Sequence, residues 1–213
     1  MVYDPQRGCV RGIDGTRDVL FSNHEIPMPP GVKPPKKETP MIITGIGSRQ
    51  TPDDICQLFT SLGAEARDRG WWIRSGHAEG ADYAFEKGAG CRCIVYMPWK
   101  GFNEKYPLLG ISRYNDLRDE VLDYVYRHDP YANDDMSQGV KRIKSRNVYQ
   151  VLGEDLKTPS DVVICWTPDG KVVGGTGLAI RIAREEGIPI VNVGDPEVMQ
   201  DFDSIIREII YDH

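Results

Sequence analysis

The stretch from Trp71 to Gly88 constrains the fold of this chain more than any other part of its sequence. Trp71 to Arg74 is a short run of aromatic and β-branched residues, typical of a buried strand. Small and polar residues with two glycines follow at 75–82, and a helical pattern opens at Tyr83. Where a strand, a glycine-rich turn and a helix start meet, free N–H groups and the positive end of the helix dipole favour an anion. The stretch therefore predicts a site for a phosphorylated ligand, such as a nucleotide.

Strands and helices alternate along the rest of the domain. We expect strands at 41–45, 71–74, 92–97, 162–166 and 190–193. We expect helices at 53–69, 83–88, 115–127, 138–156 and 178–186, and a last helix that begins at 195. This alternation predicts a parallel sheet with crossover connections, and the continuously apolar strands predict helices on both faces. The expected fold class is α/β, a Rossmann-like three-layer sandwich with about five parallel strands in the order 3-2-1-4-5.

The chain divides into an N-terminal arm and one domain. Residues 1–40 contain the proline-rich segment 26–37, which favours polyproline II and cannot build a helix. The arm is either a flexible leader or a segment that packs on a neighbouring subunit. Residues 41–213 form the predicted domain, with an irregular, insertion-like segment near 99–135.

Composition excludes several classes of protein. The formal net charge is −6 and the pI about 5.3, which weighs against nucleic acid as the main ligand. The one local basic cluster is 141–146. No apolar run approaches the ~20 residues that span a bilayer, and no secretory signal is visible, so we expect a cytoplasmic protein. The five cysteines lack disulfide or zinc spacing, and we expect neither a metal nor a cofactor.

The candidate ligand-binding residues follow three of the predicted strands. In a parallel sheet the loops at the carboxyl ends of the strands meet at one edge, where ligands bind. The candidates in these loops are Gly45, Gly47, Ser48 and Arg49 after the first strand, Ser75, Gly76, His77, Ala78, Gly80 and Asp82 after the second, and Thr167, Gly174, Gly175 and Thr176 after the fourth.

These three loops, in this order, resemble the SLOG superfamily. It groups the DNA-processing protein A fold, the lysine-decarboxylase-like LOG phosphoribohydrolases and nucleotide-sensing domains of phage-defence systems. Gly174-Gly175-Thr176 followed by 187–192 looks most like the DNA-processing protein A branch and its small bacterial and phage relatives. The resemblance covers roughly residues 41–194 and implies nucleotide binding and homo-oligomers. It also implies a ligand-binding role for Arg146 and Asn147, which resemble an Arg-Asn pair on a helix of the small members.

The sequence departs from this family at positions that matter for function. His77 stands where the family usually has a second glycine, and it is either a hydrogen-bond donor to the ligand or a loop residue without a role. The helix after Gly174 lacks the glutamate of the phosphoribohydrolases. Asp82 and Glu86, four residues apart on one helix, are alternative catalytic carboxylates. In the competing interpretation Asp82 holds loop amides and Glu86 lies on a solvated face.

Three hypotheses on function follow. In the first, the protein binds a nucleotide or a nucleotide-derived signalling molecule, as a sensor, carrier or sequestering protein. In the second, it cleaves or transfers the N-glycosidic bond of a nucleotide, with Asp82 or Glu86 as the acid. In the third, it binds single-stranded DNA as a recombination mediator, through the basic cluster at 141–144. In the first two, Trp99 and Phe102 either stack on a base or pack within the protein.

Overall fold

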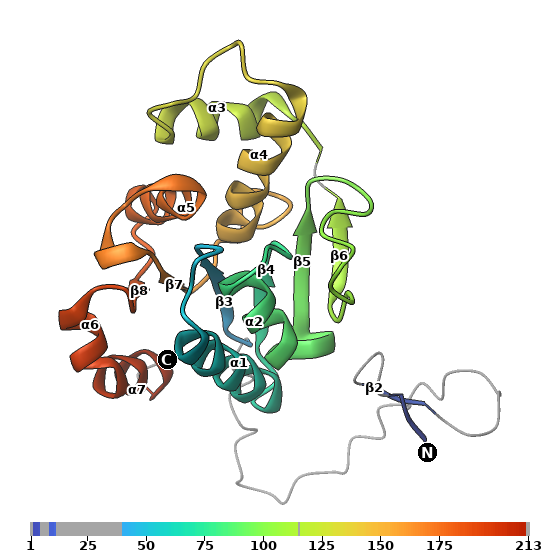
Figure 1. Ribbon diagram of the computed structural model, residues 1–213, viewed down its shortest axis with the longest axis vertical. Helices are drawn as coiled ribbons and strands as arrows, with labels where there is room; N and C mark the ends of the chain where they lie inside the picture. Colours follow the sequence, from blue (N-terminus) through green and yellow to red (C-terminus); the bar gives the residue numbers. More distant parts are fainter. Residues whose placement is uncertain (1, 5–8, 12–39, 115, 212–213) are drawn as a thin grey trace, which may run out of the picture.

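The computed structural model describes residues 2–4, 9–11, 40–114 and 116–211. The domain formed by 40–114 and 116–211 is built on one parallel sheet (Figure 1). The six strands are β3 (Ile42–Gly47), β4 (Trp72–Ser75), β5 (Cys93–Met97), β6 (Ile111–Tyr114), β7 (Val162–Trp166) and β8 (Ile190–Asn192). Their order is β6-β5-β4-β3-β7-β8, and every neighbouring pair is parallel. The α/β class and the order of the five predicted strands are confirmed.

The sixth strand is a correction. β6 lies within the segment that the sequence predicted to be irregular, and it pairs with β5 from Ile94↔Ile111 to Met97↔Tyr114. The pattern missed it because β6 is an edge strand, and none of its four residues is buried. A strand that buries neither face lacks the continuous apolar run by which the others were recognised.

Seven α-helices connect and flank the strands in the described part of the chain. They are α1 (Asp53–Asp68), α2 (Ala81–Ala89), α3 (Asp119–His128), α4 (Gln138–Leu152), α5 (Gly174–Glu185), α6 (Pro196–Gln200) and α7 (Phe202–Tyr211). The bounds of several differ from expectation. α3 begins at Asp119 and not at 115. The last helix, expected to begin at 195, is divided into α6 and α7. α4 ends earlier, because Gly153 takes a φ of 81° and breaks the helix. α5 begins at Gly174, so the third glycine-rich loop is the first turn of a helix.

Helix ends carry the chemistry expected of them. Pro52 precedes α1, and the first turn of α1 contains Asp53 and Asp54. Their negative charges are stabilised by the positive end of the helix dipole. The hydroxyl of Ser137 caps α4 by accepting the N–H of Val140. These local signals set where α1 and α4 begin, and therefore where their side chains meet the sheet.

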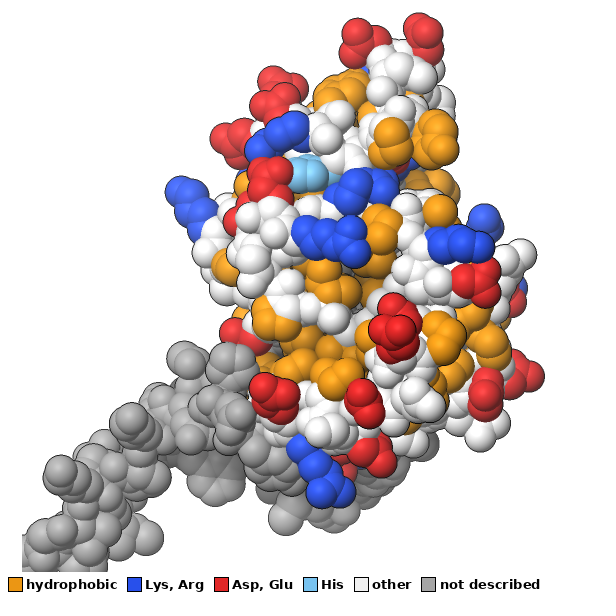
Figure 2. Space-filling model, turned by 90° about the vertical axis from the view of Figure 1, so that its left-hand side faces the viewer, with side chains coloured by type: hydrophobic (Ala, Val, Ile, Leu, Met, Phe, Trp, Pro, Cys, Tyr) orange, Lys and Arg blue, Asp and Glu red, His pale blue; other side chains and the backbone are white. Residues whose placement is uncertain are grey.

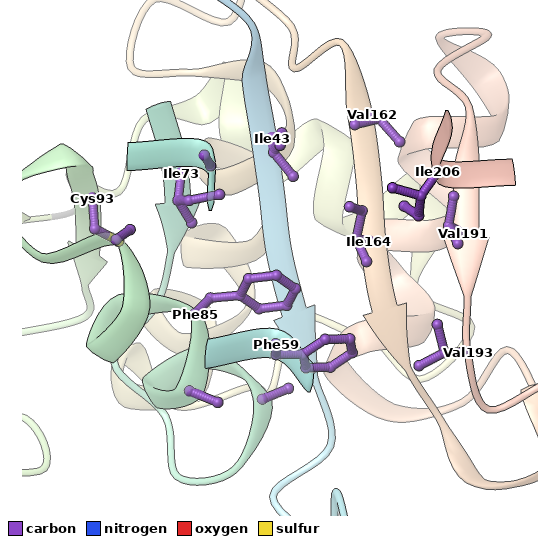
Figure 3. Packing of buried hydrophobic residues seen from close by; sticks show 14 of the residues in the cluster. Ile43, Phe59, Ile73, Phe85, Cys93, Val162, Ile164, Val191, Val193 and Ile206 are labelled. Carbon is purple, nitrogen blue, oxygen red and sulfur yellow. The ribbon is translucent and has the colours of Figure 1, made fainter. Parts of the chain in front are cut away.

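Helices cover both faces of the sheet, which makes the three-layer sandwich. On one face α1, α2 and α7 enclose a core that includes Phe59, Phe85 and Ile206 (Figure 3). The rings of Phe59 and Phe85 stack with centroids 4.3 Å apart. Burying each of these rings contributes about 1.5–3 kcal/mol to stability. On the other face α3, α4 and α5 enclose a second core around Val148 and Leu178.

Two short strands stand outside this domain. β1 (Val2–Asp4) and β2 (Cys9–Arg11) pair antiparallel, from Val2↔Arg11 to Asp4↔Cys9. The arm prediction did not foresee this pairing. The proline-rich segment 26–37 lies outside the described residues. In the described part of the chain, none of the helices combines the length and the apolarity that a bilayer span requires.

Candidate functional site

A pocket of about 430 Å³ opens where the loops after β3 and β7 meet α4 and the start of α5. β3 and β7 are neighbours in the sheet, so their carboxyl ends bring these loops together. Most of the candidate ligand-binding residues line this pocket. They are Gly47, Ser48, Arg49, Ala78, Arg146, Asn147, Thr167, Gly174, Gly175 and Thr176.

The start of α5 forms one wall and presents free backbone N–H groups. The first hydrogen bond at this end of α5 runs from the N–H of Gly177 to the carbonyl of Val173, 2.8 Å long. The N–H groups of Gly174, Gly175 and Thr176 precede it and have no partner within the helix. A Cβ on Gly174 would have no heavy atom within 4 Å, so the backbone borders open space. This wall is suited to an anion.

Arg146 supplies a buried positive charge to the same pocket. Only 7% of the residue is exposed, and its Nη1 donates to the carbonyl of Gly76 at 2.9 Å, while Nε has no hydrogen-bond partner. Burial lowers the pKa of the Arg146 guanidinium, Asp82 raises it again, and Arg49 lowers it. Two guanidinium groups thus face one space, and none of the described lining residues is a carboxylate. An anion bound there would relieve the repulsion between them.

Two amide side chains hold the walls in place. Asn147 donates its Nδ2 to the carbonyl of Gly175 at 3.2 Å, which ties α4 to the first turn of α5. Asn192, on β8, donates to the hydroxyl of Thr167 at 2.7 Å and accepts the N–H of Thr167 at 3.1 Å. Sequence reasoning did not select Asn192 as a site residue, because its partner is 25 positions away in sequence.

Several candidate residues stand behind the pocket and support it. The hydroxyl of Ser75 donates at 3.0 Å to the carbonyl of Gly45 or, at an equal distance, to that of Asp82. The carbonyl of Gly76 holds Arg146. A Cβ on Gly80 would lie 2.6 Å from the carbonyl oxygen of Ser48, so the glycine lets the two loops touch. The pocket lining does not include Gly45, Ser75, Gly76 or Gly80.

His77 and Glu86 form a buried pair away from the pocket. Nδ1 of His77 lies 2.6 Å from Oε2 of Glu86, and the two residues are 1% and 0% exposed. Oε1 of Glu86 accepts the N–H of Leu109 at 2.7 Å. The alternative placement of Glu86 on a solvated face is therefore wrong, because the segment after β5 folds over α2 and covers it. The ring of His77 contacts Glu86, and His77 does not line the pocket.

Asp82 lies between the buried arginine and the first loop. It is 1% exposed, its Oδ1 accepts the N–H of Gly47 at 3.2 Å, and its Oδ2 has no hydrogen-bond partner. Burial raises the pKa of Asp82 to about 6, against the opposing effects of Arg146 and of backbone N–H groups. This contact to the N–H of Gly47 fits the interpretation in which Asp82 holds loop amides. Neither Asp82 nor Glu86 lines the pocket, and their catalytic role stays a prediction.

The pocket also contains residues outside the candidate set. They are Ile46, Gln50, Phe102, Ile143, Pro168 and Val173. Ile143 precedes Arg146 and Asn147 by about one helical turn, a spacing that places all three on one face of α4. That signal was present in the sequence. For Phe102 the sequence left open whether the ring stacks on a base or packs within the protein, and the fold brings its irregular loop to the pocket.

The structure of this chain is similar to some solved structures of other proteins. No protein-family model and no curated protein matches the sequence. DNA processing protein A from Helicobacter pylori, a single-stranded DNA-binding protein, is similar at 19% identity and a TM-score of 0.47, over 79% of this chain and 74% of that one. The molybdenum cofactor carrier protein of Chlamydomonas reinhardtii is similar at 18% identity and a TM-score of 0.47, over 80% and 87% of the two chains. Both are Rossmann-like folds of the SLOG type.

Proposed function

We propose that this protein binds a nucleotide or a nucleotide-derived molecule in the pocket between α4, α5 and the loops after β3 and β7, as a sensor, carrier or sequestering protein. One observation carries the proposal. The pocket brings Arg49, the buried Arg146 and the free N–H groups at the start of α5 to one space that no described carboxylate lines. In a chain of net charge −6, such local positive character favours an anionic ligand.

In this proposal the phosphate lies against Gly174, Gly175 and Thr176. The backbone N–H groups and the hydroxyl of Thr176 donate to its oxygens, and Arg146 supplies the opposite charge. Burial of Arg146 strengthens this attraction, because the local dielectric is lower than that of water. Arg49, on the opposite loop, adds a second donor fork.

Replacing Gly174 tests the phosphate position with a matched control. Gly174 and Gly187 have φ values of 63° and 68°, and a Cβ on either meets no atom within 4 Å. Alanine therefore costs both sites a similar backbone strain, of about 1 kcal/mol. Only Gly174 borders the pocket. We expect Gly174→Ala to weaken binding of AMP or GMP by at least about tenfold, which is ~1.4 kcal/mol, and Gly187→Ala to leave it unchanged.

Isothermal titration calorimetry and urea unfolding on the same samples make this measurement. Arg146→Met, which keeps the length of the side chain but removes its charge, should abolish binding. Equal nucleotide affinity in wild type and both Gly174→Ala and Arg146→Met would contradict the proposal.

The glycosidic-bond hypothesis receives less support from the geometry. It needs a carboxylate beside the ligand, and Asp82 and Glu86 both lie behind the pocket wall. Chromatography of AMP incubated with the protein separates the two hypotheses. Release of free adenine that Asp82→Asn abolishes would establish the enzyme.

Single-stranded DNA is also less well supported. In the basic cluster on α4, Lys144 forms an ion pair with Asp129, and Lys141 donates to the carbonyl of Asp134 at 3.3 Å. Figure 2 shows one face of the molecule, on which several basic side chains gather in the upper half and acidic side chains lie around them. Binding of an oligonucleotide that falls steeply with salt would favour this hypothesis instead.

A further inference from the structure

The segment 99–110, here called the strap, joins β5 to β6 and folds back over α2. Its contacts are specific. Nδ2 of Asn103 donates to the backbone carbonyl of His77 at 2.8 Å, and the N–H of Leu109 donates to Glu86 at 2.7 Å. The ring of Tyr106 stacks on Tyr83 with centroids 4.3 Å apart. The strap is therefore held at its start, middle and end by α2 and the loop before it.

This attachment places one aromatic ring in the pocket. Phe102 lines the pocket, and the guanidinium carbon of Arg146 lies 5.3 Å from the centre of its ring. The ring of Trp99 meets Phe102 edge-on at 5.4 Å. A cation on an aromatic face is attracted by the ring quadrupole, so Arg146 and Phe102 hold each other in position. Phe102 is the single aromatic residue among the described lining residues.

We propose that Phe102 is the subsite for the planar ring of the ligand, and that Asn103 positions it. The inference rests on the proposed function and names the class of ligand more closely, as a phosphate ester that also carries an aromatic base. Phosphate binds at the start of α5 and beside Arg146, while the base packs against the ring of Phe102. Stacking on an aromatic face tolerates every base, so Phe102 selects for a ring and not for a particular base.

Asn103 is the positioning residue because it fixes the backbone next to Phe102. Its φ is 57°, in the left-handed region that asparagine tolerates better than most residues. Its amide holds the carbonyl of His77, and the side chain of His77 is held in turn by the buried Glu86. In this proposal Glu86 and His77 position Asn103, and through it Phe102, without touching the ligand themselves.

The experiment compares ligands with and without a ring. AMP, GMP, CMP and UMP are titrated into wild type, Phe102→Leu and Asn103→Gly, beside ribose 5-phosphate. Leucine keeps an apolar side chain without the ring. Glycine accepts the left-handed backbone and removes only the amide, so this variant should fold. We expect both variants to bind the four nucleotides about fivefold more weakly than wild type, as for one lost aromatic contact. Their affinity for ribose 5-phosphate should stay within about twofold of the wild-type value.

A matched control is Asn133→Gly, at an exposed asparagine remote from the strap in sequence, which should change no affinity. Equal weakening of nucleotides and ribose 5-phosphate in Phe102→Leu would overturn the ring subsite. Unchanged nucleotide binding in Asn103→Gly would overturn the positioning role. If wild type binds none of these compounds, the proposed function itself fails, which is a different result.

Discussion

At the scale of single residues, Gly76 lets two opposite charges approach each other inside the protein. A Cβ at this position would lie 2.8 Å from both Nε of Arg146 and Oδ2 of Asp82. Both atoms are buried without a hydrogen-bond partner. A carboxyl group in this environment is costly to ionise, which is why the pKa of Asp82 rises from 3.8 to about 6.

This raised pKa predicts a pH-dependent stability. The folded state holds the proton of Asp82 more tightly than the unfolded state. Protonation of Asp82 therefore contributes to the free energy of unfolding, most below pH 3.8, and this contribution is lost as the pH rises to about 6. Asp82→Asn removes the dependence. We therefore expect the stability of this variant, relative to wild type, to increase by about 2–3 kcal/mol between pH 3.5 and 7. Urea unfolding across that range measures the difference, and a difference that does not change with pH would contradict the assignment.

At the scale of secondary-structure elements, two glycines set the distance between α1 and α2. A Cβ on Gly88 would lie 2.0 Å from the carbonyl oxygen of Thr60, and one on Gly63 would lie 2.6 Å from that of Phe85. The two helices therefore pack backbone against backbone. Because α2 carries Asp82 and Glu86, this packing also sets the position of the loops behind the pocket.

Alanine at Gly88 should separate the helices. We expect Gly88→Ala to lower the free energy of unfolding by about 1–3 kcal/mol, because overpacking displaces backbone as well as side chains. Gly139→Ala is the helical control. Its Cβ would meet only the hydroxyl of Ser137, at 3.9 Å, so it should raise stability by about 0.4–1 kcal/mol. Thermal unfolding of both variants compares them, and a Gly88→Ala protein as stable as Gly139→Ala would argue against tight helix packing.

At the scale of the whole molecule, the domain and the pocket belong to one part of the chain. All residues of both cores lie between Met41 and Ile209, and all described lining residues lie between Ile46 and Thr176. The division into an arm at 1–40 and a domain at 41–213 stays a prediction. The two interpretations of the arm differ in one testable respect, because only a packed arm would contribute to the stability of the protein.

Removal of residues 1–39 provides the test. If the arm is a flexible leader, the chain 40–213 should unfold within about 2 °C of the full chain, since a change of 1 kcal/mol shifts Tm by about 2–4 °C in a domain of this size. Its affinity for AMP or GMP should also be unchanged. A lower Tm together with a smaller mass in light scattering would instead favour an arm that packs on a neighbouring subunit.

The sequence by itself determined the class of fold, the order of five strands and the edge of the sheet at which the pocket lies. These follow from local patterns, since apolar runs, helical periods and glycine-rich loops each occupy a few neighbouring residues. The resemblance to the SLOG superfamily rested on the same loops. For Gly174, Gly175 and Thr176, local chemistry was enough to select pocket residues.

Only the tertiary structure decided which candidates line the pocket and which support it. Gly80 and Gly174 look alike in the sequence, yet one packs against Ser48 and the other borders open space. Phe102 owes its place in the pocket, and Glu86 its burial, to the strap, whose path depends on contacts such as the one between Leu109 and Glu86, 23 positions apart. Burial and long-range contacts arise only when distant segments meet, and no local pattern encodes them.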